Sequence, residues 1–359
     1  MTEEIRMETK IWRLDGTPIR EAAAIREAAA LLKDRQTVAF PTETVYGLGA
    51  DARSDEAVAR IFQAKGRPAD NPLIVHIADI GQLSDVAARI EPAARRLIDR
   101  FWPGPLTIVC PVKPGTVSAK VTAGLPTVGV RMPNHPVALA LIAAAGCPVA
   151  APSANRSGRP SPTKADHVLE DLNGRIAGIV DGGPCRVGVE STVVEVHGES
   201  AVILRPGGIG IEALREVVPE VRLDAALLRP EQDTVAPRSP GMKYRHYAPQ
   251  GTMVVISGAS AERVRMKMRE ELEAARRRGL RTGVLACIEH VPHYEADLVQ
   301  SYGERSQEQE AARSLYDALR RFDRAGIQFI AAEGLPEKGL GLAVMNRLVK
   351  AAAGRWIRV

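Results

Sequence analysis

Aromatic side chains are scarce in this chain of 359 residues, since Phe, Trp and Tyr together make up 4% of it. Proteins that bind single-stranded nucleic acid by stacking its bases depend on such rings. No apolar run approaches the roughly 20 residues of a membrane-spanning helix. The charged segment at residues 1–10 lacks the apolar core of a signal peptide. The sequence therefore disfavours a base-stacking nucleic-acid binder and a membrane protein.

Cysteine is also rare. The four cysteines lie far apart and form no CxxC pair: Cys110, Cys147, Cys185 and Cys287. Zinc sites use closely spaced ligands, and disulfide frameworks belong to oxidising compartments. We therefore expect free thiols, no metal site made by the protein itself, and a cytoplasmic location.

The usual signatures of nucleotide-binding loops and serine hydrolases are missing. The chain contains neither GxxxxGK[ST] nor GxSxG. Residues 208–213 imitate a dinucleotide fingerprint, but Pro206 and Gly207 separate them from the preceding strand. A proline-rich segment then follows where further strand–helix units are required. Any nucleotide must therefore be bound in another way.

The composition is that of a globular protein, with 45% hydrophobic and 25% charged residues and a net charge of +5. This mild basicity permits an anionic substrate or RNA but requires neither. Helix and strand patterns alternate over the first two-thirds of the chain. We predict helices at 21–35 and 55–65, the second capped by Ser54, and strands at 37–40, 73–77, 106–112, 127–133, 178–183, 191–196 and 201–206. Strands this close together favour a mixed, twisted α/β sheet.

A change in composition marks a domain boundary. Residues 228–250 contain four prolines within LRPEQDTVAPRSPGMKYRHYAPQ, which is typical of a linker. Residues 251–359 alternate strand and helix patterns and predict a small, parallel, Rossmann-like α/β domain. We predict a first α/β domain at 12–227, a linker at 228–250 and a second domain at 251–359.

The segment KGRPADNPLIVHI, residues 65–77, places two cations two positions apart and a histidine inside an apolar strand. Gly66 and Pro68 disfavour a helix, and in an extended backbone Lys65 and Arg67 project to the same side. Two like charges on one side indicate a bound anion. The alternative is a solvated basic loop, and for His76 it is a satisfied core histidine.

Three further segments concentrate groups that bind ligands. The strand at 127–131 places Thr127, Gly129 and Arg131 on one face. The loop at 151–163 is rich in Ser, Asn, Gly and Pro and follows a strand, where α/β sheets bind ligands. The segment at 41–49 carries three hydroxyl side chains and Glu43 before two glycines. An edge strand face and plain surface loops remain the alternatives.

Taken in order, these segments resemble the YrdC-type domain. The motifs are PTETVYGLGADA, KGRPADNPLIVHI, FWPGPLTIV, PTVGVRMPNHP, APSANRSGRPSPT, GVESTVV and ILRPGG. The following SPGMKYRHYAP resembles the linker of the two-domain form of the threonylcarbamoyl-AMP synthase family. The resemblance covers residues 15–250 by motif and the remainder by size and strand–helix pattern. It implies a YrdC-like first domain that carries the catalysis.

The resemblance implies an enzyme that makes threonylcarbamoyl-adenylate and pyrophosphate from ATP, L-threonine and bicarbonate. A separate transferase complex then uses this adenylate to modify tRNA beside the anticodon. Mg²⁺ is expected to be held mainly by the phosphates. A double-stranded RNA-binding or ribosome-associated factor is the main alternative. A carbamoyl transferase for protein maturation is a third, but its acylphosphatase and zinc-finger modules are not visible in the sequence.

The resemblance also implies roles for individual residues. Lys65 and Arg67 would be the catalytic cations. ATP would be bound by Lys65, Arg67, Asn71, Thr127, Ser153, Asn155, Ser161, Arg205 and His246. Threonine would be bound by Thr44, His76, Arg131, Ala151 and Ser191. Ala151 stands where the family often has a hydroxyl residue, so only a backbone contact is expected there. His246 would make the linker a lid over the nucleotide.

Overall fold

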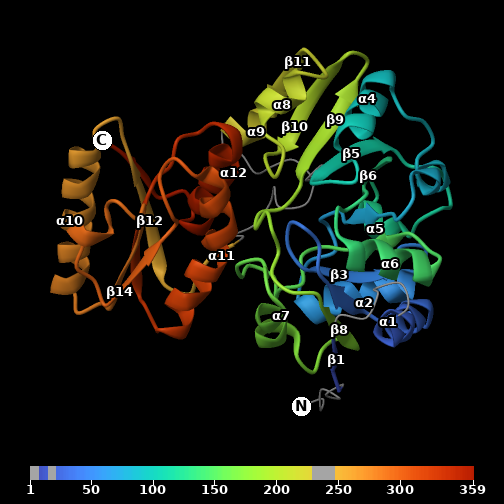
Figure 1. Cartoon of the computed structure of the whole chain (residues 1–359), viewed down its shortest axis with the longest axis horizontal. Coiled ribbons are helices and arrows are strands. Elements are labelled where there is room, and N and C mark those ends of the chain that lie inside the picture. The colour runs from blue at the N-terminus through green and yellow to red at the C-terminus, as the bar shows by residue number, and fades with distance from the viewer. Residues whose placement is uncertain (1–7, 15–21, 229–246) are drawn as a thin grey trace. The chain divides into compact units, whose positions relative to one another are not determined.

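A computed structural model describes residues 8–14, 22–228 and 247–359, which form two compact units (Figure 1). The second unit contains the described residues from Tyr247 on, together with the short segments Gly158–Pro160 and Val187–Val189. The other described residues form the first unit. His246 and most of the predicted linker lie outside the described residues.

Within the described residues, the first unit is built on a mixed sheet of eleven strands in the order β1-β8-β2-β3-β7-β4-β6-β5-β9-β10-β11. The strands are β1 (Lys10–Arg13), β2 (Val38–Phe40), β3 (Gly47–Asp51), β4 (Ile74–His76), β5 (Leu106–Pro111), β6 (Thr127–Arg131), β7 (Val149–Ala150), β8 (Gly178–Asp181), β9 (Thr192–His197), β10 (Ser200–Arg205) and β11 (Glu220–Leu223). It contains both parallel and antiparallel pairs. The predicted mixed α/β sheet is confirmed.

The helices of this unit are mostly short. They are α1 (Ala23–Lys33), α2 (Asp55–Lys65), α3 (Leu83–Val86), α4 (Pro92–Phe101), α5 (Ala119–Thr122), α6 (Pro136–Ala145), α7 (Ala165–Leu172), α8 (Ile211–Arg215) and α9 (Ala225–Leu228), with the 3₁₀ turn η1 (Ile80–Gln82). The predicted cap of α2 is present, since Ser54 Oγ accepts a hydrogen bond from the amide of Ala57 at 3.2 Å. Within the described residues, no helix has both the length and the apolar character needed to cross a bilayer.

Alternation along the strands explains how both faces of the sheet are covered. In β2, Val38 and Phe40 join the apolar cluster that contains α1 and α6, whereas Ala39 belongs to the cluster that contains α2 and α4. Neighbouring residues of a strand point to opposite faces, so each face of the sheet receives its own layer of helices. The ends of the strands are thereby left to carry polar groups.

The predicted helix at 55–65 is confirmed, but the expectation that Lys65 and Arg67 project from one extended segment was wrong. Lys65 is the last residue of α2, and Gly66, with a φ of 60°, ends the helix in the left-handed conformation. A glycine adopts this conformation without the clash of a Cβ atom, so Gly66 terminates the helix rather than preventing it. Lys65 and Arg67 therefore do not project from one extended segment.

Strand β3 was not predicted, because the segment 41–49 was expected to bind a ligand. Its two glycines, Gly47 and Gly49, pair with β2 in an antiparallel register. A Cβ atom at Gly49 would lie 2.7 Å from Phe40 Cε1 and 2.8 Å from Val149 Cγ1. The glycine is thus required by close packing of the sheet against two buried side chains.

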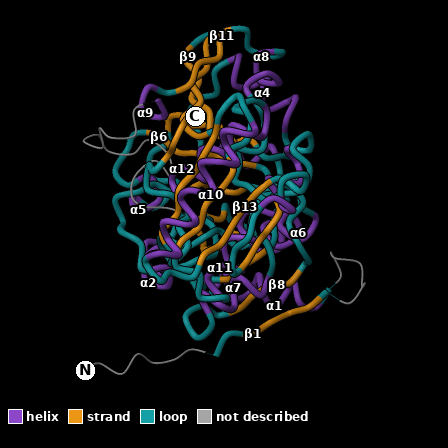
Figure 2. Tube along the Cα trace, turned by 90° about the vertical axis from the view of Figure 1, so that its left-hand side faces the viewer, coloured by secondary structure: helices purple, strands orange, loops and turns teal. Residues whose placement is uncertain are grey.

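The second unit contains a parallel sheet of five strands in the order β14-β13-β15-β12-β16. Its elements are β12 (Thr252–Ser257), α10 (Ala261–Arg277), β13 (Thr282–Ala286), η2 (Val291–His293), β14 (Leu298–Ser301), α11 (Glu308–Arg324), β15 (Phe329–Glu333), α12 (Gly339–Ala351) and β16 (Trp356–Arg358). Helix α10 covers one face of the sheet and packs its apolar side on β12, β13 and β15 (Figure 2). The predicted parallel α/β domain is confirmed.

Helix α11 holds the segment Gly158–Pro160 within this unit. The buried Arg320 donates a hydrogen bond to the carbonyl oxygen of Pro160 at 2.6 Å. The amide of Ala248 donates to the carbonyl oxygen of Gly158 at 2.9 Å. Tyr247 stacks on Tyr316 of α11 with 5.6 Å between the ring centroids. The described end of the predicted linker thus packs on α11.

We expect Gly49→Ala to lower the free energy of unfolding by about 1–3 kcal/mol, because the added methyl group overpacks the site between Phe40 and Val149. Denaturant unfolding of the purified variant measures this. Gly198→Asn is the control, because a Cβ atom there meets nothing within 4 Å and asparagine tolerates the left-handed conformation. Equal stabilities of the two variants would contradict the packing argument.

Candidate functional site

The turn between β2 and β3 is folded by its own hydroxyl groups. Thr42 Oγ1 accepts hydrogen bonds from the amides of Thr44 and Val45 at 3.2 and 3.3 Å. It also lies 2.8 Å from Thr44 Oγ1. These bonds fix a tight turn in which Glu43 and Thr44, both buried, face the end of β6.

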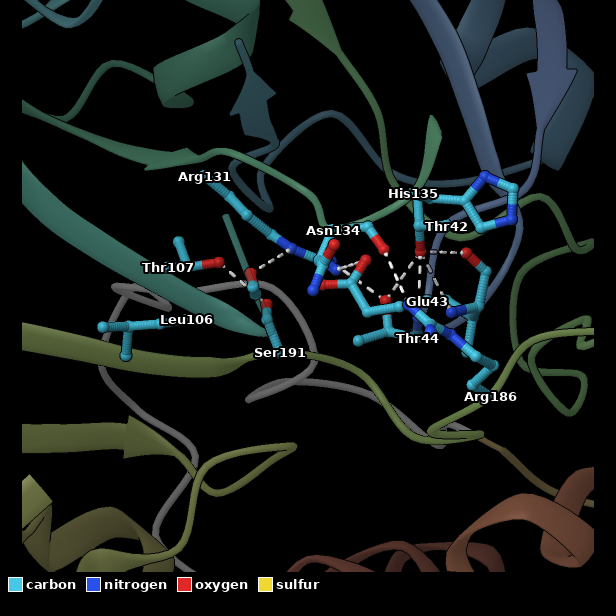
Figure 3. A network of polar contacts seen from close by, with 12 residues as sticks. Thr42, Glu43, Thr44, Leu106, Thr107, Arg131, Asn134, His135, Arg186 and Ser191 are labelled. Atoms are coloured by element: carbon cyan, nitrogen blue, oxygen red, sulfur yellow. Dashed lines mark hydrogen bonds and ion pairs between the residues drawn. The ribbon is translucent and has the colours of Figure 1, made fainter. Parts of the chain in front are cut away.

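Arg131, at the end of β6, is the centre of the polar network in Figure 3. Its Nη1 donates to Thr44 Oγ1 at 2.9 Å, and its Nη2 lies 2.7 Å from Glu43 Oε2. The Arg131 and Glu43 side chains are 5% and 3% exposed. A buried ion pair costs several kcal/mol of desolvation per ion, so it is weak evidence for stability alone. Its position among hydroxyl groups indicates a ligand site.

His76 lies beside Arg131, because β4 pairs with β6 in the register that places these two residues opposite each other. Its Nδ1 lies 3.2 Å from the carbonyl oxygen of Ile74, and its ring meets the edge of Phe40. Burial, followed by the charge of Arg131, lowers the pKa of His76 to about 3. The imidazole is therefore neutral at physiological pH, which fits both a core histidine and a ligand contact.

Ser191 connects three strands. Its Oγ lies 2.8 Å from Thr107 Oγ1 of β5. Arg205, at the end of β10, donates to the carbonyl oxygen of Ser191 at 3.0 and 3.2 Å and to its Oγ at 3.1 Å. All three side chains are buried. Arg205, predicted to contact the nucleotide, thus holds Ser191, predicted to contact threonine.

Lys65 organises the loop that follows β7. Its buried ammonium group donates to the carbonyl oxygens of Ser153 and Asn155, the latter at 2.6 Å. Ser153 Oγ in turn donates to Asn155 Oδ1 at 2.5 Å. Burial and the charge of Arg67 hold the pKa of Lys65 well below its usual range. The structure therefore brings three predicted nucleotide-binding residues together, since Lys65 contacts Ser153 and Asn155.

The environment of Asn71 indicates that a ligand binds near Arg67. Arg67 Nη2 donates to the carbonyl oxygens of Asn71 and Pro72 at 3.1 and 3.2 Å, which folds this loop back on itself. The side-chain amide of Asn71 is buried, and within the described residues it has no hydrogen-bond partner. Buried polar groups are almost always hydrogen-bonded. A bound polar ligand would satisfy this one.

The remaining predicted residues are more dispersed. Ser161 Oγ donates to Glu190 at 2.6 Å, and Glu190 immediately precedes Ser191. Thr127 is half-buried at the start of β6. Ala151 is buried, and its amide is already bonded to the carbonyl oxygen of Ile74 at 2.9 Å. His246 lies outside the described residues.

Three polar residues of the network are absent from the predicted site: Glu43, Thr107 and Glu190. Glu43 could have been included in the predicted site, because it is an acidic residue next to the predicted Thr44. A lone threonine in the apolar strand LTIVCPV gives no such signal, because threonine is common in strands. Only the pairing of β5 with β9 brings Thr107 to Ser191.

We expect His76 to make folding sensitive to acid. Its pKa is about 3 when folded and its ordinary value is 6.5, so the unfolded chain binds a proton first as the pH falls. Stability is then lost below pH 6.5 by up to about 1.4 kcal/mol per pH unit. Urea unfolding measures the free energy of unfolding at about pH 7 and about pH 5. Between these two pH values it should fall by about 2 kcal/mol less in His76→Gln than in the unaltered protein.

The exposed His293, the last residue of η2, provides the control for this measurement. His293→Gln should leave the pH dependence unchanged. A His76→Gln protein that loses as much stability as the unaltered one would contradict a neutral, buried imidazole.

Two family models match the chain. Residues 30–207 match the Sua5/YciO/YrdC model, described as "Telomere recombination", and residues 209–353 match the model described as "Threonylcarbamoyl-AMP synthase, C-terminal domain". The threonylcarbamoyl-AMP synthase of Bacillus subtilis is 52% identical over 354 residues, which cover 98% of this chain and 100% of the relative. The enzyme of the same name from Pyrococcus abyssi is 50% identical over 335 residues, covering 93% and 96%.

Solved structures give the same answer. The structure of P. abyssi Sua5 complexed with L-threonine matches with a TM-score of 0.89 and 48% identity, covering 98% of this chain and 99% of that one. The structure of a doubly substituted variant of P. abyssi Sua5 matches with a TM-score of 0.90 and 47% identity, covering 98% of each chain. The family predicted from the ordered motifs is confirmed, and the chain belongs to the threonylcarbamoyl-AMP synthase family.

Proposed function

We propose that this protein joins L-threonine, CO₂ derived from bicarbonate, and ATP to form L-threonylcarbamoyl-adenylate and pyrophosphate. The observation that carries the proposal is the convergence of Thr44, His76 and Arg131 at one buried place beside the turn 42–44. The relative from P. abyssi has been solved with L-threonine bound. An enzyme of this class is also what the family membership indicates.

Arg131 would hold the threonine carboxylate, because a guanidinium group binds a carboxylate with two parallel hydrogen bonds. Thr44 and Ser191 would hold the hydroxyl group and orient the amino acid. The amine then forms a bond to the carbon of CO₂, and the resulting carbamate oxygen attacks the α-phosphorus of ATP. The bond from that phosphorus to the bridging oxygen breaks, and pyrophosphate leaves.

When the carbamate attacks ATP, both reacting groups are anionic. Positioning and cationic stabilisation therefore contribute most to catalysis. We assign positioning to Lys65 and cationic stabilisation to Arg67. Lys65, whose ammonium group holds two carbonyl oxygens of the 151–157 loop, would shape the nucleotide site. Arg67 and the unsatisfied amide of Asn71 would contact the nucleotide directly. Mg²⁺ would enter as part of the ATP substrate, bound to the phosphates.

The product is a reactive mixed anhydride, which fits a downstream transferase that moves the threonylcarbamoyl group to tRNA. The RNA-binding alternative is not favoured, because a buried Arg–Glu pair with hydroxyl groups suits a small polar ligand rather than a duplex. We also propose a cytoplasmic setting, because the four cysteines are free and buried.

The first experiment is to measure pyrophosphate release from ATP and Mg²⁺ in bicarbonate buffer, with and without L-threonine, and to identify the products by mass spectrometry. We expect release that depends on threonine, together with the mass of threonylcarbamoyl-adenylate. A folded protein that releases no pyrophosphate, or releases it equally without threonine, would contradict the proposal.

We expect Arg67→Ala to reduce threonine-dependent pyrophosphate release at least about 100-fold, because removal of one positioned group that stabilises transition-state charge typically costs about 10²–10³ in rate. Lys65→Ala should cause a similar loss and also loosen the 151–157 loop, which limited proteolysis would detect. Arg89→Ala is the matched control, because the Arg89 side chain is 74% exposed. Near-normal turnover of a folded Arg67→Ala protein would exclude the assigned role.

A further inference from the structure

We propose that Glu43 binds the ammonium group of threonine and accepts the proton that the amine must lose before it reacts with CO₂. This inference rests on the proposed function and adds a catalytic base to it. Neither the sequence motifs nor the predicted site residues assign a role to this carboxylate.

The first argument is the unsatisfied state of the carboxylate. Glu43 is 2% exposed, and within the described residues neither of its oxygens has a hydrogen-bond partner. Its contact with Arg131 Nη2 at 2.7 Å is an ion pair that lacks hydrogen-bond geometry. A buried carboxylate is expensive unless donors surround it. Glu43 therefore has acceptor capacity beside Arg131, where a donor is expected to bind.

The second argument is charge complementarity. The pair presents a negative charge at Glu43 and a positive charge at Arg131, side by side and screened from water. A free amino acid carries the opposite pair, an ammonium and a carboxylate on one carbon atom. When its carboxylate occupies Arg131, its ammonium group is brought next to the adjacent Glu43. The buried ion pair is thus complementary to an amino-acid zwitterion.

Two other titratable groups near Glu43 add no charge beside the Glu43–Arg131 pair. His135 precedes α6, and burial lowers its pKa, although Glu43 opposes the shift and Arg186 adds to it. Cys185 follows β8, and burial raises its pKa far above neutral. Both side chains are therefore uncharged near pH 7. Arg131, from β6, is the charged group in direct contact with the carboxylate.

The chemistry requires such a base, because an ammonium nitrogen has no electron pair with which to attack CO₂. One N–H bond breaks and its proton moves to a Glu43 oxygen. Glu43 passes that proton to the hydroxyl group of bicarbonate, whose C–OH bond breaks to give water and CO₂. The amine nitrogen then bonds to the CO₂ carbon, and the second proton leaves through Glu43 to solvent. In total, the ammonium form of threonine and bicarbonate give the carbamate, water and one proton.

The test compares the binding of two ligands to Glu43→Gln by calorimetry. The ligands are L-threonine and 2,3-dihydroxybutanoate of matching configuration, in which a hydroxyl group replaces the ammonium group. The unaltered protein should prefer threonine, and the variant should lose about tenfold or more of that preference, because a charge-assisted hydrogen bond is removed. If Glu43 only held Arg131 in place, both ligands would weaken by the same factor, and the proposal would be overturned.

The rate provides a second readout. Glu43→Gln should slow pyrophosphate release at least about tenfold near neutral pH. Its rate should then rise with pH as threonine loses its proton in solution. Glu43→Asp should restore part of the rate because it retains the carboxylate. A Glu43→Gln rate close to normal, with an unchanged pH profile, would also overturn the proposal.

Asp99→Asn is the control, because this carboxylate of α4 is 57% exposed, pairs with the exposed Arg95 and should affect neither readout. The two proposals can fail separately. If the unaltered protein released no pyrophosphate, the proposed function would fail, and the ligand comparison would still decide whether Glu43 contacts the ammonium group. If release occurred but the preference for threonine survived in Glu43→Gln, only the role of Glu43 would fail.

Discussion

The arrangement of the site depends on one buried ion pair, between Glu43 in the turn after β2 and Arg131 at the end of β6. Removing either partner would leave a charge in a place from which water is excluded, which typically costs about 3–5 kcal/mol. In the intact protein the carboxylate is held beside Arg131, because the turn 42–44 is closed by its own threonine hydroxyl groups. A pair of apolar residues would stabilise the same position more simply. The charged pair is therefore best explained by what it binds.

The order of the strands explains why residues distant in sequence meet at this pair. β4 and β6 are parallel neighbours, so His76 and Arg131 stand side by side at their ends. β5 lies on the other side of β6 and pairs with β9, which brings Thr107 next to Ser191. Apolar side chains of the same strands pack into the hydrophobic core. Polar groups are thereby concentrated at the strand ends, where the backbone leaves the sheet.

Much of this could be predicted from the sequence, and the failures have physical causes. Strand periodicity and the cap at Ser54 located most elements of the first unit, and the ordered motifs located the threonine-binding candidates. Lys65 and Arg67 do not share the expected extended segment, because α2 ends at Lys65 and the left-handed Gly66 turns the backbone between them. Strand β3 was missed because its glycines look like a loop, although close packing on Phe40 requires them. Partners such as Thr107 depend on strand pairing, which local patterns do not encode.

The loops that carry the site are also tied, along the chain, to the second unit. Gly158–Pro160 directly precedes Ser161, and Val187–Val189 directly precedes Glu190 and Ser191; both segments fold with the second unit. The carbonyl oxygen of Pro160 is held by the buried Arg320 of α11, one residue from the hydroxyl group that binds Glu190. Two short segments that fold with the second unit are therefore followed directly in the chain by residues of the polar network.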